Sequence, residues 1–327
     1  MQTDNIFMNN SNSGDIANSG NATNYVYIGG IIAYLDKNNK ISEAGKNAKY
    51  KLTNSGDIEN AGSAKNICIG GLFGRNSSGY FYMEGTASVY STNSGDITDT
   101  SGNTKSNGGD LSIGGIAGYT TTGIKTQYAR NSGTIYVTGD KGSTSVNVGG
   151  IGGWISNNGF NFNNCRNTGD ITVDCTTTAS LWVAGIVGCP KPNGTTHYYW
   201  RSNATIDTHL ATVGGENYTA GLMGTTEGDS ANTFTMYGHR LAGTVWGSKT
   251  TTGLFCCTKT NECSFSFQGG TGNPNMIAPG TVRKDNTHED TVNAITDVTI
   301  GILAGGEGST YDIASAIESQ HIVVIEW

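Results

Sequence analysis

The stretch Asn54-Ser55-Gly56-Asp57-Ile58 decides the fold of this chain, because copies of it recur along the sequence. Good copies of this first mark lie at residues 12–16, 93–97, 131–135 and 167–171, and weaker copies at residues 203–206, 242–245 and 279–282. Successive copies are roughly 35 to 42 residues apart. A fixed period of this length indicates a repeat architecture in which each repeat is one supersecondary unit.

A second mark, Ile69-Gly70-Gly71-Leu72-Phe73-Gly74, lies between copies of the first. Related stretches begin at residues 28, 113, 148, 183 and 220, with weaker copies at residues 252 and 300. Two interleaved marks that share one period strengthen the case for a repeat array, because chance recurrence of one motif would not keep a second in step.

Each period also contains short runs such as Ile135-Tyr136-Val137 and Ile171-Thr172-Val173, whose alternation is typical of half-buried strands. The glycines suit sharp corners, which need positive φ or close backbone contact. The Asn before them suits left-handed geometry and bonds to the local backbone. The sequence therefore predicts an all-β, right-handed parallel β-helix (β-solenoid) of about eight coils, with the Ile of the first mark in an internal ladder and its Asp facing outward.

Two regions are expected along the chain. Residues 1–280 form the solenoid array, and residues 281–327 form the last degenerate coil and a small C-terminal cap. Within the cap, the pattern predicts a short amphipathic helix from Tyr311 to Gln320 and a buried strand from Ile322 to Ile325. The alternative is that this segment begins a further domain.

Composition excludes several classes of protein. Glycine supplies 49 of 327 residues while only 4 are proline, which does not fit collagen, and a charged fraction of 14% argues against a disordered chain. A net charge of −7 offers no basic stripe for nucleic acid or an anionic membrane, and no apolar run is long enough for membrane insertion. The lysine-poor, Asn/Ser/Thr/Gly-rich composition predicts an extracellular or cell-surface protein whose leader is not present in this chain.

Neither a cofactor nor a metal ion is expected. The repeated Gly-Gly stretches lack the single strand-to-helix context of a phosphate-binding loop. A file of Asp15, Asp57, Asp96 and Asp170 is a candidate calcium site, but Thr134 interrupts it and the alternative of outward turn residues is preferred. The seven cysteines lack zinc spacing and are expected to be mostly buried free thiols, with local pairing among Cys256, Cys257 and Cys263 as the alternative.

No catalytic residue is assigned. The five histidines fall in no recognisable nucleophile or zinc motif. Because some parallel β-helices are polysaccharide lyases or hydrolases, which need clustered carboxylates, an alternative enzymatic site is a grouping of Asp207, Glu216, Glu227 and Asp229.

The candidate ligand-binding residues are aromatic and concentrate between residues 150 and 250. Aromatic side chains anchor protein interfaces and present flat apolar faces on which sugar rings stack. The alternative is that they fill corners and cover the sides of the solenoid. The seven residues are Trp154, Trp182, Tyr198, Tyr199, Trp200, Tyr218 and Trp246.

The two marks resemble the GLUG-type repeats of bacterial surface proteins, whose signature is a hydrophobic-Gly-Gly-hydrophobic-x-Gly stretch followed by Asn-x-Gly and a short strand. Good matches run from about residue 12 to 224 and degraded ones to about 305, and copies after residue 200 lose the Gly-Asp pair. The resemblance implies a secreted or cell-surface protein of adhesin-like character and carries over no catalytic residues.

Three functional hypotheses follow. The preferred one is a non-catalytic extracellular solenoid that presents a lateral surface for adhesion to a glycan or a host or cell-surface protein. The second is a carbohydrate-active β-helix enzyme, and the third is a structural spacer or fibre subunit that associates end to end or side by side through exposed strand edges.

Overall fold

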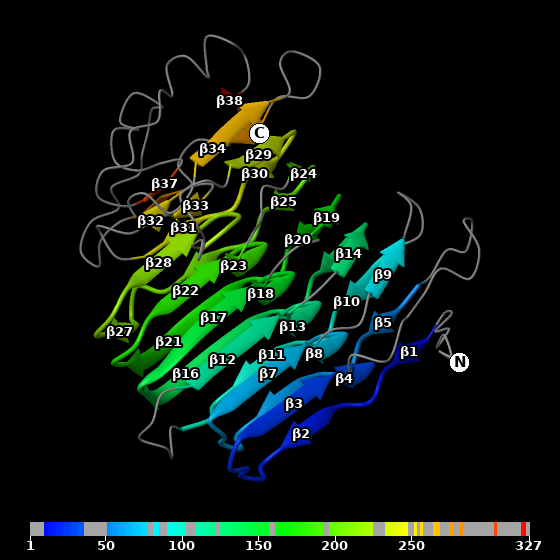
Figure 1. Ribbon diagram of the computed structural model, residues 1–327, viewed down its shortest axis with the longest axis vertical. Coiled ribbons are helices and arrows are strands. Elements are labelled where there is room, and N and C mark those ends of the chain that lie inside the picture. The colour runs from blue at the N-terminus through cyan, green and yellow to red at the C-terminus, as the bar shows by residue number, and fades with distance from the viewer. Residues whose placement is uncertain are drawn as a thin grey trace.

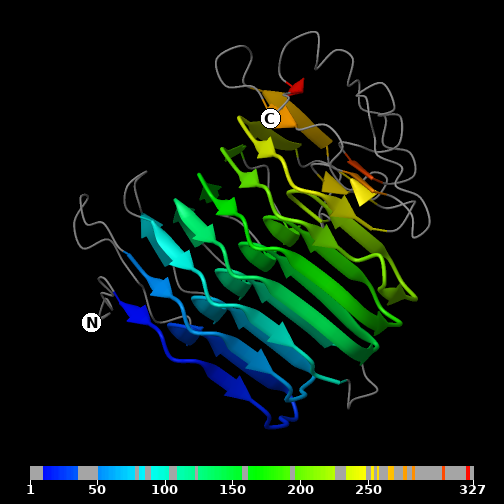
Figure 2. The same cartoon turned by 180° about the vertical axis from the view of Figure 1, so that it is seen from behind.

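The computed structural model describes residues 10–35, 51–77, 81–84, 90–102, 109–121, 124–156, 161–191, 196–224 and 233–247, together with short strands at 252–253, 256–257, 264–268, 275–277, 282–283, 304–305 and 322–324. All regular elements among them are strands, and every pairing between strands is parallel. The prediction of an all-β parallel solenoid is therefore confirmed. Figures 1 and 2 show the strands stacked as rungs, with β1 to β4 at one end and β34 and β38 at the other.

Five sheets take one strand from each successive repeat, and we number them I to V in the order in which the chain passes through them. Sheet I contains β1 (Ser11–Asn12), β5 (Thr53–Asn54), β10 (Ser91–Asn93), β15 (Ala129–Asn131), β20 (Arg166–Asn167), β25 (Arg201–Ser202), β30 (Arg240–Leu241), β35 (Asn275–Ile277) and β38 (Ile322–Val324). Sheet II contains β2 (Ile16–Asn18), β6 (Ile58–Asn60), β11 (Ile97–Asp99), β16 (Ile135–Gly142), β21 (Ile171–Thr177), β26 (Ile206–Asp207), β31 (Val245–Trp246) and β36 (Val282–Arg283), and β27 (Thr212–Val213) also pairs with β21.

The other three sheets complete each coil. Sheet III contains β3 (Tyr25–Gly29), β7 (Asn66–Gly70), β12 (Gly109–Gly114), β17 (Thr144–Gly149), β22 (Leu181–Ala184), β28 (Asn217–Ala220) and β32 (Thr252–Gly253). Sheet IV contains β4 (Ile32–Leu35), β8 (Phe73–Asn76), β13 (Ala117–Thr120), β18 (Gly152–Ser156) and β23 (Val187–Lys191). Sheet V contains β9 (Phe81–Glu84), β14 (Ile124–Gln127), β19 (Asn161–Asn163), β24 (Thr196–Tyr198), β29 (Thr233–Tyr237) and β34 (Ser264–Gln268), and β33 (Cys256–Cys257) pairs separately with β37 (Ala304–Gly305).

The isoleucine of the first mark forms the predicted internal ladder. In sheet II, Ile58 pairs with Ile16 on one side and Ile97 on the other, and the register continues through Ile135 and Ile171. From Ile58 onward these side chains are at most 1% exposed. Full burial of one isoleucine contributes about 1.5–3 kcal/mol, so the ladder is a major source of coil-to-coil stability.

The Asn of the first mark forms a second ladder that the sequence reasoning did not foresee. Asn54 Nδ2 donates to Asn93 Oδ1 in the next coil at 2.8 Å, and to the carbonyl oxygen of Gly56 at 2.8 Å. The same pair of bonds starts from three further asparagines, namely Asn12, Asn93 and Asn131. Local backbone bonding was expected of these asparagines, whereas bonding from coil to coil is new.

The corners at the first mark depend on close contact rather than on positive φ. Among the described non-glycine residues, positive φ occurs only at Tyr128, Asn164 and Tyr199, so the left-handed geometry expected for the Asn of the mark is wrong. Gly56 is needed for space, because a Cβ atom there would lie 2.1 Å from the carbonyl oxygen of Gly14. Side chains larger than hydrogen are therefore excluded where one coil rests on the last.

Sheet IV lies against sheet III through the last glycine of the second mark. A Cβ atom on Gly118 would lie 2.6 Å from the carbonyl oxygen of Ile69 in β7. In consequence both faces of sheet III are covered, and all four residues of β22 are buried. The surface formed along the margin of sheets III and IV carries the aromatic residues discussed below.

The C-terminal region is described only in part. A strand was predicted from Ile322 to Ile325, and β38 (Ile322–Val324) lies within this range and extends sheet I beyond β35. The predicted burial of this strand lies outside the described side chains. The helix predicted from Tyr311 to Gln320 lies outside the described residues. The described part of the chain contains no helix long and apolar enough to cross a membrane.

Candidate functional site

A file of aromatic residues with one arginine runs across successive coils along sheets III and IV, and we call it the aromatic file. Its members are Tyr25, Tyr27, Tyr34, Arg75, Tyr119 and Trp154. The β-sheet register fixes their order, because Tyr34, Arg75, Tyr119 and Trp154 pair with one another in β4, β8, β13 and β18. Each is thus held at the same place in its own coil.

The members of the aromatic file touch from end to end. The rings of Tyr27 and Tyr34 stack with centroids 5.0 Å apart, and Arg75 Nη1 donates a hydrogen bond to the Tyr27 hydroxyl at 2.6 Å. Arg75 Cζ also lies 4.8 Å from the ring centroid of Tyr119, within cation–π range. Tyr119 and Trp154 stack with centroids 4.3 Å apart and ring planes 9° apart.

Burial and mutual contact change the pKa values of two members of the aromatic file, Tyr27 and Arg75. Burial raises the pKa of the Tyr27 hydroxyl, and the adjacent Arg75 guanidinium offsets part of this rise. For Arg75, burial alone would lower the pKa. Tyr27, Cys68 and Tyr119 together raise it by more, so the net shift of the Arg75 pKa is upward. Arg75 is therefore a permanent cation among phenol groups, which suits hydrogen bonding to a polar ligand.

The most exposed members of the aromatic file are in its first coil. Tyr25 is 52% exposed and Tyr34 is 44% exposed, whereas Tyr119 and Trp154 are half-buried. Trp154 packs on a small cluster that contains Trp182, Cys189 and Tyr218, in which both aromatic side chains are buried. Three of the seven predicted residues, Trp154, Trp182 and Tyr218, therefore gather in one place, but only Trp154 is accessible to a ligand.

Trp200 is one of the seven candidate ligand-binding residues, and the structure places its side chain in the core. Its side chain is 0% exposed, and its indole Nε1 donates to the carbonyl oxygen of Phe162 at 2.7 Å. The reason is the β-sheet register. Arg166 and Arg201 are paired, so the residues just before them, Cys165 and Trp200, occupy equivalent positions in successive coils, and both side chains are buried.

The other predicted aromatics lie away from the aromatic file. Tyr199 meets Tyr237 edge to face with centroids 5.8 Å apart. Trp246, in sheet II, stacks on His209 with centroids 3.6 Å apart. Tyr198 ends β24, and its side chain lies outside what the structure describes.

The acidic file of the first mark has a structural role. Asp57 is exposed as predicted, and its Oδ1 accepts a hydrogen bond from the backbone N–H of Asp96 at 2.8 Å. Asp15 and Asp96 accept equivalent bonds from Asp57 and Thr134. No three His, Cys, Asp or Glu side chains in the described part of the chain come together to hold a metal ion.

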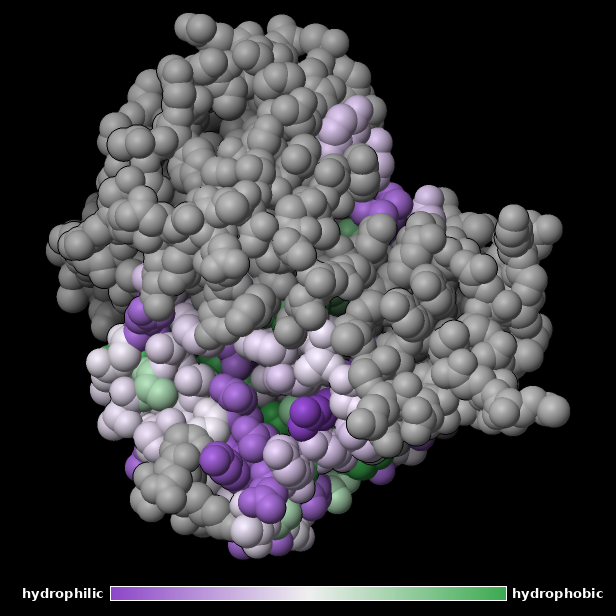
Figure 3. All heavy atoms as spheres, viewed as in Figure 1, coloured by the Kyte–Doolittle hydropathy of each residue, from purple (hydrophilic) through white to green (hydrophobic). Residues whose placement is uncertain are grey.

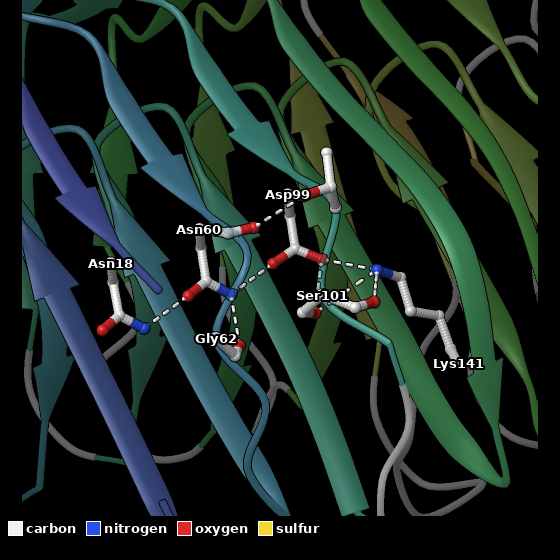
Figure 4. A network of polar contacts seen from close by, with 7 residues as sticks. Asn18, Asn60, Gly62, Asp99, Ser101 and Lys141 are labelled. Atoms are coloured by element: carbon white, nitrogen blue, oxygen red, sulfur yellow. Dashed lines mark hydrogen bonds and ion pairs between the residues drawn. The ribbon is translucent and has the colours of Figure 1, made fainter. Parts of the chain in front are cut away.

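A buried ion pair stabilises the inside of sheet II (Figure 4). Asn18 and Asn60 donate in turn along a polar row to Asp99 Oδ1, and Lys141 Nζ lies 2.6 Å from Asp99 Oδ2 on the opposite side. Lys141 is the bulged residue of β16, and the side chains of this pair are 3% and 0% exposed. Since neither group reaches solvent, the pair is structural rather than catalytic.

The partly exposed acid–base pair of the described chain is His209 Nδ1 with Asp207 Oδ1. It lies beside Trp246 on sheet II. Asp207 was one of four carboxylates considered for an enzymatic site; Glu227 and Asp229 lie outside the described residues. A histidine held by a carboxylate can transfer protons, so this pair is where the enzymatic alternative would have to begin.

The described cysteines are buried free thiols, which confirms the prediction for Cys68, Cys165, Cys175 and Cys189. Burial raises the pKa of Cys68 to about 12 and that of Cys175 to about 11. Such thiols are inert as nucleophiles. The pairing considered for Cys256, Cys257 and Cys263 lies outside the described side chains.

Sequence reasoning missed Arg75 and Tyr119 although a signal was present. The residue directly after the last glycine of the second mark is Arg75, Tyr119 and Trp154 in three successive copies. Aligning that position would have found the aromatic file. No protein-family model matches this chain, and no curated protein and no solved structure matches it significantly.

Proposed function

We propose that this chain is a non-catalytic, extracellular or cell-surface solenoid that binds a glycan along the aromatic file. The observation that carries the proposal is the unbroken contact from Tyr27 through Arg75 and Tyr119 to Trp154 across four coils. A side chain repeated at one place in successive coils makes a linear surface, and a polysaccharide is a linear ligand.

The chemistry of the aromatic file suits sugars. Inside the file each ring covers its neighbour, so a ligand meets ring edges, phenol hydroxyl groups and a guanidinium group that donates hydrogen bonds. Tyr25 and Tyr34, the most exposed members, offer the largest free ring area for stacking. On the face shown in Figure 3, hydrophobic residues of the described chain form only small separate patches, which favours a polar ligand over a large apolar protein interface.

The finer architecture belongs to the same proposal. We take the coil to be right-handed with about eight turns, because crossovers between parallel strands are right-handed in nearly all proteins. The resemblance of the two marks to GLUG-type repeats, together with the lysine-poor composition, supports a bacterial surface location and an adhesin-like role.

A carbohydrate-active enzyme is the second candidate, favoured by the contact between Asp207 and His209 beside Trp246. Trp246 would provide a platform for a sugar ring and His209 would transfer a proton. This site lies on sheet II, whereas the aromatic file lies on sheets III and IV, so variants separate the two candidates.

The test is a glycan array probed with the parent chain and with the double variant Tyr25→Ala/Tyr34→Ala. Each side chain is about half exposed, so the fold should survive their loss. The matched control is Tyr136→Ala, which removes a tyrosine 39% exposed on sheet II. We expect the double variant to bind the array ligand about tenfold more weakly or worse, equivalent to about 1.4 kcal/mol, and the control to bind like the parent. Equal binding by all three proteins would remove the aromatic file as the binding surface.

A further inference from the structure

Four arginines form a second file, on sheet I, which we call the arginine ladder. Its members are Arg130, Arg166, Arg201 and Arg240, one from each of β15, β20, β25 and β30. They are direct partners in the parallel register, so successive Cα atoms are about 4.8 Å apart. The same place is occupied by Thr92 in β10 and by Met276 in β35, which bounds the ladder to four coils.

The alternation of the strand directs these side chains outward. The residues just before them, Ala129, Cys165, Trp200 and His239, are all buried in the interior. Successive residues of a strand point to opposite faces, so each arginine faces the outside of the coil. Exposure agrees, because Arg201 is exposed and the other three are half-buried.

No carboxylate in the described part of the chain forms an ion pair with the arginine ladder. The ion pairs found there are Lys141 with Asp99 and His209 with Asp207, both on sheet II. Burial lowers the pKa of Arg201, and the neighbouring Arg240, Arg166 and Arg130 lower it further. The four guanidinium groups of the arginine ladder therefore repel one another. They form a local positive charge on a chain whose net charge is −7.

The contacts of Arg166 and Arg130 with the rest of the chain do not balance this charge. Arg166 Nε is buried and finds no acceptor among the described residues. Arg130 is held by the ring of Tyr90, whose centroid lies 3.3 Å from Arg130 Cζ. Neither arginine has a carboxylate partner among the described residues, so its charge is left for an anionic ligand to balance.

In three of the four coils that contribute to the arginine ladder, the corner just before the arginine has a left-handed backbone at a non-glycine residue. Tyr128, Asn164 and Tyr199 have φ values of 60°, 54° and 57°, and each lies two residues before an arginine of the ladder. Left-handed backbone at non-glycine residues is uncommon, and for Tyr it costs free energy. The repeated corner therefore sets three of the four ladder coils apart from the other described coils.

We infer that the arginine ladder binds a linear anionic polysaccharide, whose acidic groups pair with successive guanidinium groups. Guanidinium groups match carboxylate and sulfate oxygens with two parallel hydrogen bonds, which explains why all four positions are arginine and none is lysine. A nucleic acid fits less well, because its dense charge would be repelled by the acidic remainder of the chain and its binding needs a broad basic surface. This site adds to the proposed function and lies on a different sheet from the aromatic file.

The test measures binding of the full chain to polygalacturonate, which carries carboxylates, and to dextran sulfate, with uncharged dextran as the reference. The variant is Arg166→Gln/Arg201→Gln. The control Lys51→Gln/Lys65→Gln removes the same charge from two exposed lysines outside the ladder. Circular dichroism checks that both variants fold.

We expect at least tenfold weaker binding of one or both acidic polymers by the arginine variant, and a salt dependence whose logarithmic slope is smaller by about two. The lysine control should bind like the parent. Preference for one polymer identifies carboxylate or sulfate as the acidic group.

Equal losses in both variants, or no binding of either polymer beyond that of dextran, would overturn the inference. Tighter ladder-dependent binding of a single-stranded oligonucleotide would overturn it in favour of nucleic acid. The arginine variant should keep full binding to the array ligand of the aromatic file, so failure here and failure of the proposed function are distinguishable.

Discussion

Replacing one asparagine of the second ladder, which the Asn of the first mark forms, should destabilise the protein far more than replacing an equally buried asparagine outside this ladder. Asn93 accepts a bond from Asn54, donates to Asn131 Oδ1 at 2.9 Å and donates to the carbonyl oxygen of Gly95 at 2.8 Å. Asn93→Leu keeps the branching and the number of side-chain heavy atoms but removes all three bonds, and the control below makes the same change of size. At about 1 kcal/mol for each, the loss is about 3 kcal/mol, and the polar atoms left without partners increase it.

The matched control is Asn147→Leu in sheet III. Asn147 is also 0% exposed, but neither its Nδ2 nor its Oδ1 has a partner among the described residues. Leucine at this position removes two unsatisfied polar atoms, so we expect an unchanged or higher free energy of unfolding. Urea titrations followed by circular dichroism would compare both variants with the parent. Similar losses in the two variants, or full stability of Asn93→Leu, would refute the reasoning.

Three further predictions follow from the packing. Lys141→Met leaves Asp99 charged and buried without its cationic partner, which should lower the free energy of unfolding by about 3–5 kcal/mol. Adding Asp99→Asn should recover most of this loss. A double-mutant cycle measured by urea titration tests both expectations. Gly115→Ala should lower the melting temperature, because its Cβ would lie 2.2 Å from a carbonyl oxygen, whereas Gly102→Ala, with no atom within 4 Å, should not. Alkylation of the buried Cys68 thiol, followed by peptide mass spectrometry, should require unfolding. Burial raises the pKa of this thiol from 9.0 to about 12, so only the unfolded chain loses the thiol proton just above pH 9. The free energy of unfolding should therefore decline as the pH rises above about 9.

The repeat marks predicted the backbone well for a physical reason. In a stacked array each residue of a mark meets its own copy in the next coil, so the period alone gives the partners of Ile58 or Gly56. The outward Asp and the buried thiols follow from the same alternation. The Asn ladder was missed because Asn was considered only as a turn residue, whereas its amide can both donate and accept along the stack.

The candidate site was predicted less well, because residue type was used where register was needed. Trp200 counted as a candidate ligand-binding residue because it is aromatic. Its position just before Arg201 is the inward-facing position that Cys165 has one coil earlier. The arginine one residue later was overlooked, since the acidic net charge suggested that no basic stripe exists. Net charge averages over the whole surface, whereas a stack concentrates one residue type on one line.

Binding of polysaccharide without cleavage can be checked by measuring both properties on one polysaccharide panel. Co-sedimentation would report binding, and release of new reducing ends would report cleavage, for the parent chain and for Tyr25→Ala/Tyr34→Ala. For a non-catalytic solenoid we expect binding that depends on the two tyrosines, with no new reducing ends. Release of oligosaccharides that persists in the tyrosine variant and is lost in His209→Ala would contradict it and identify an enzyme.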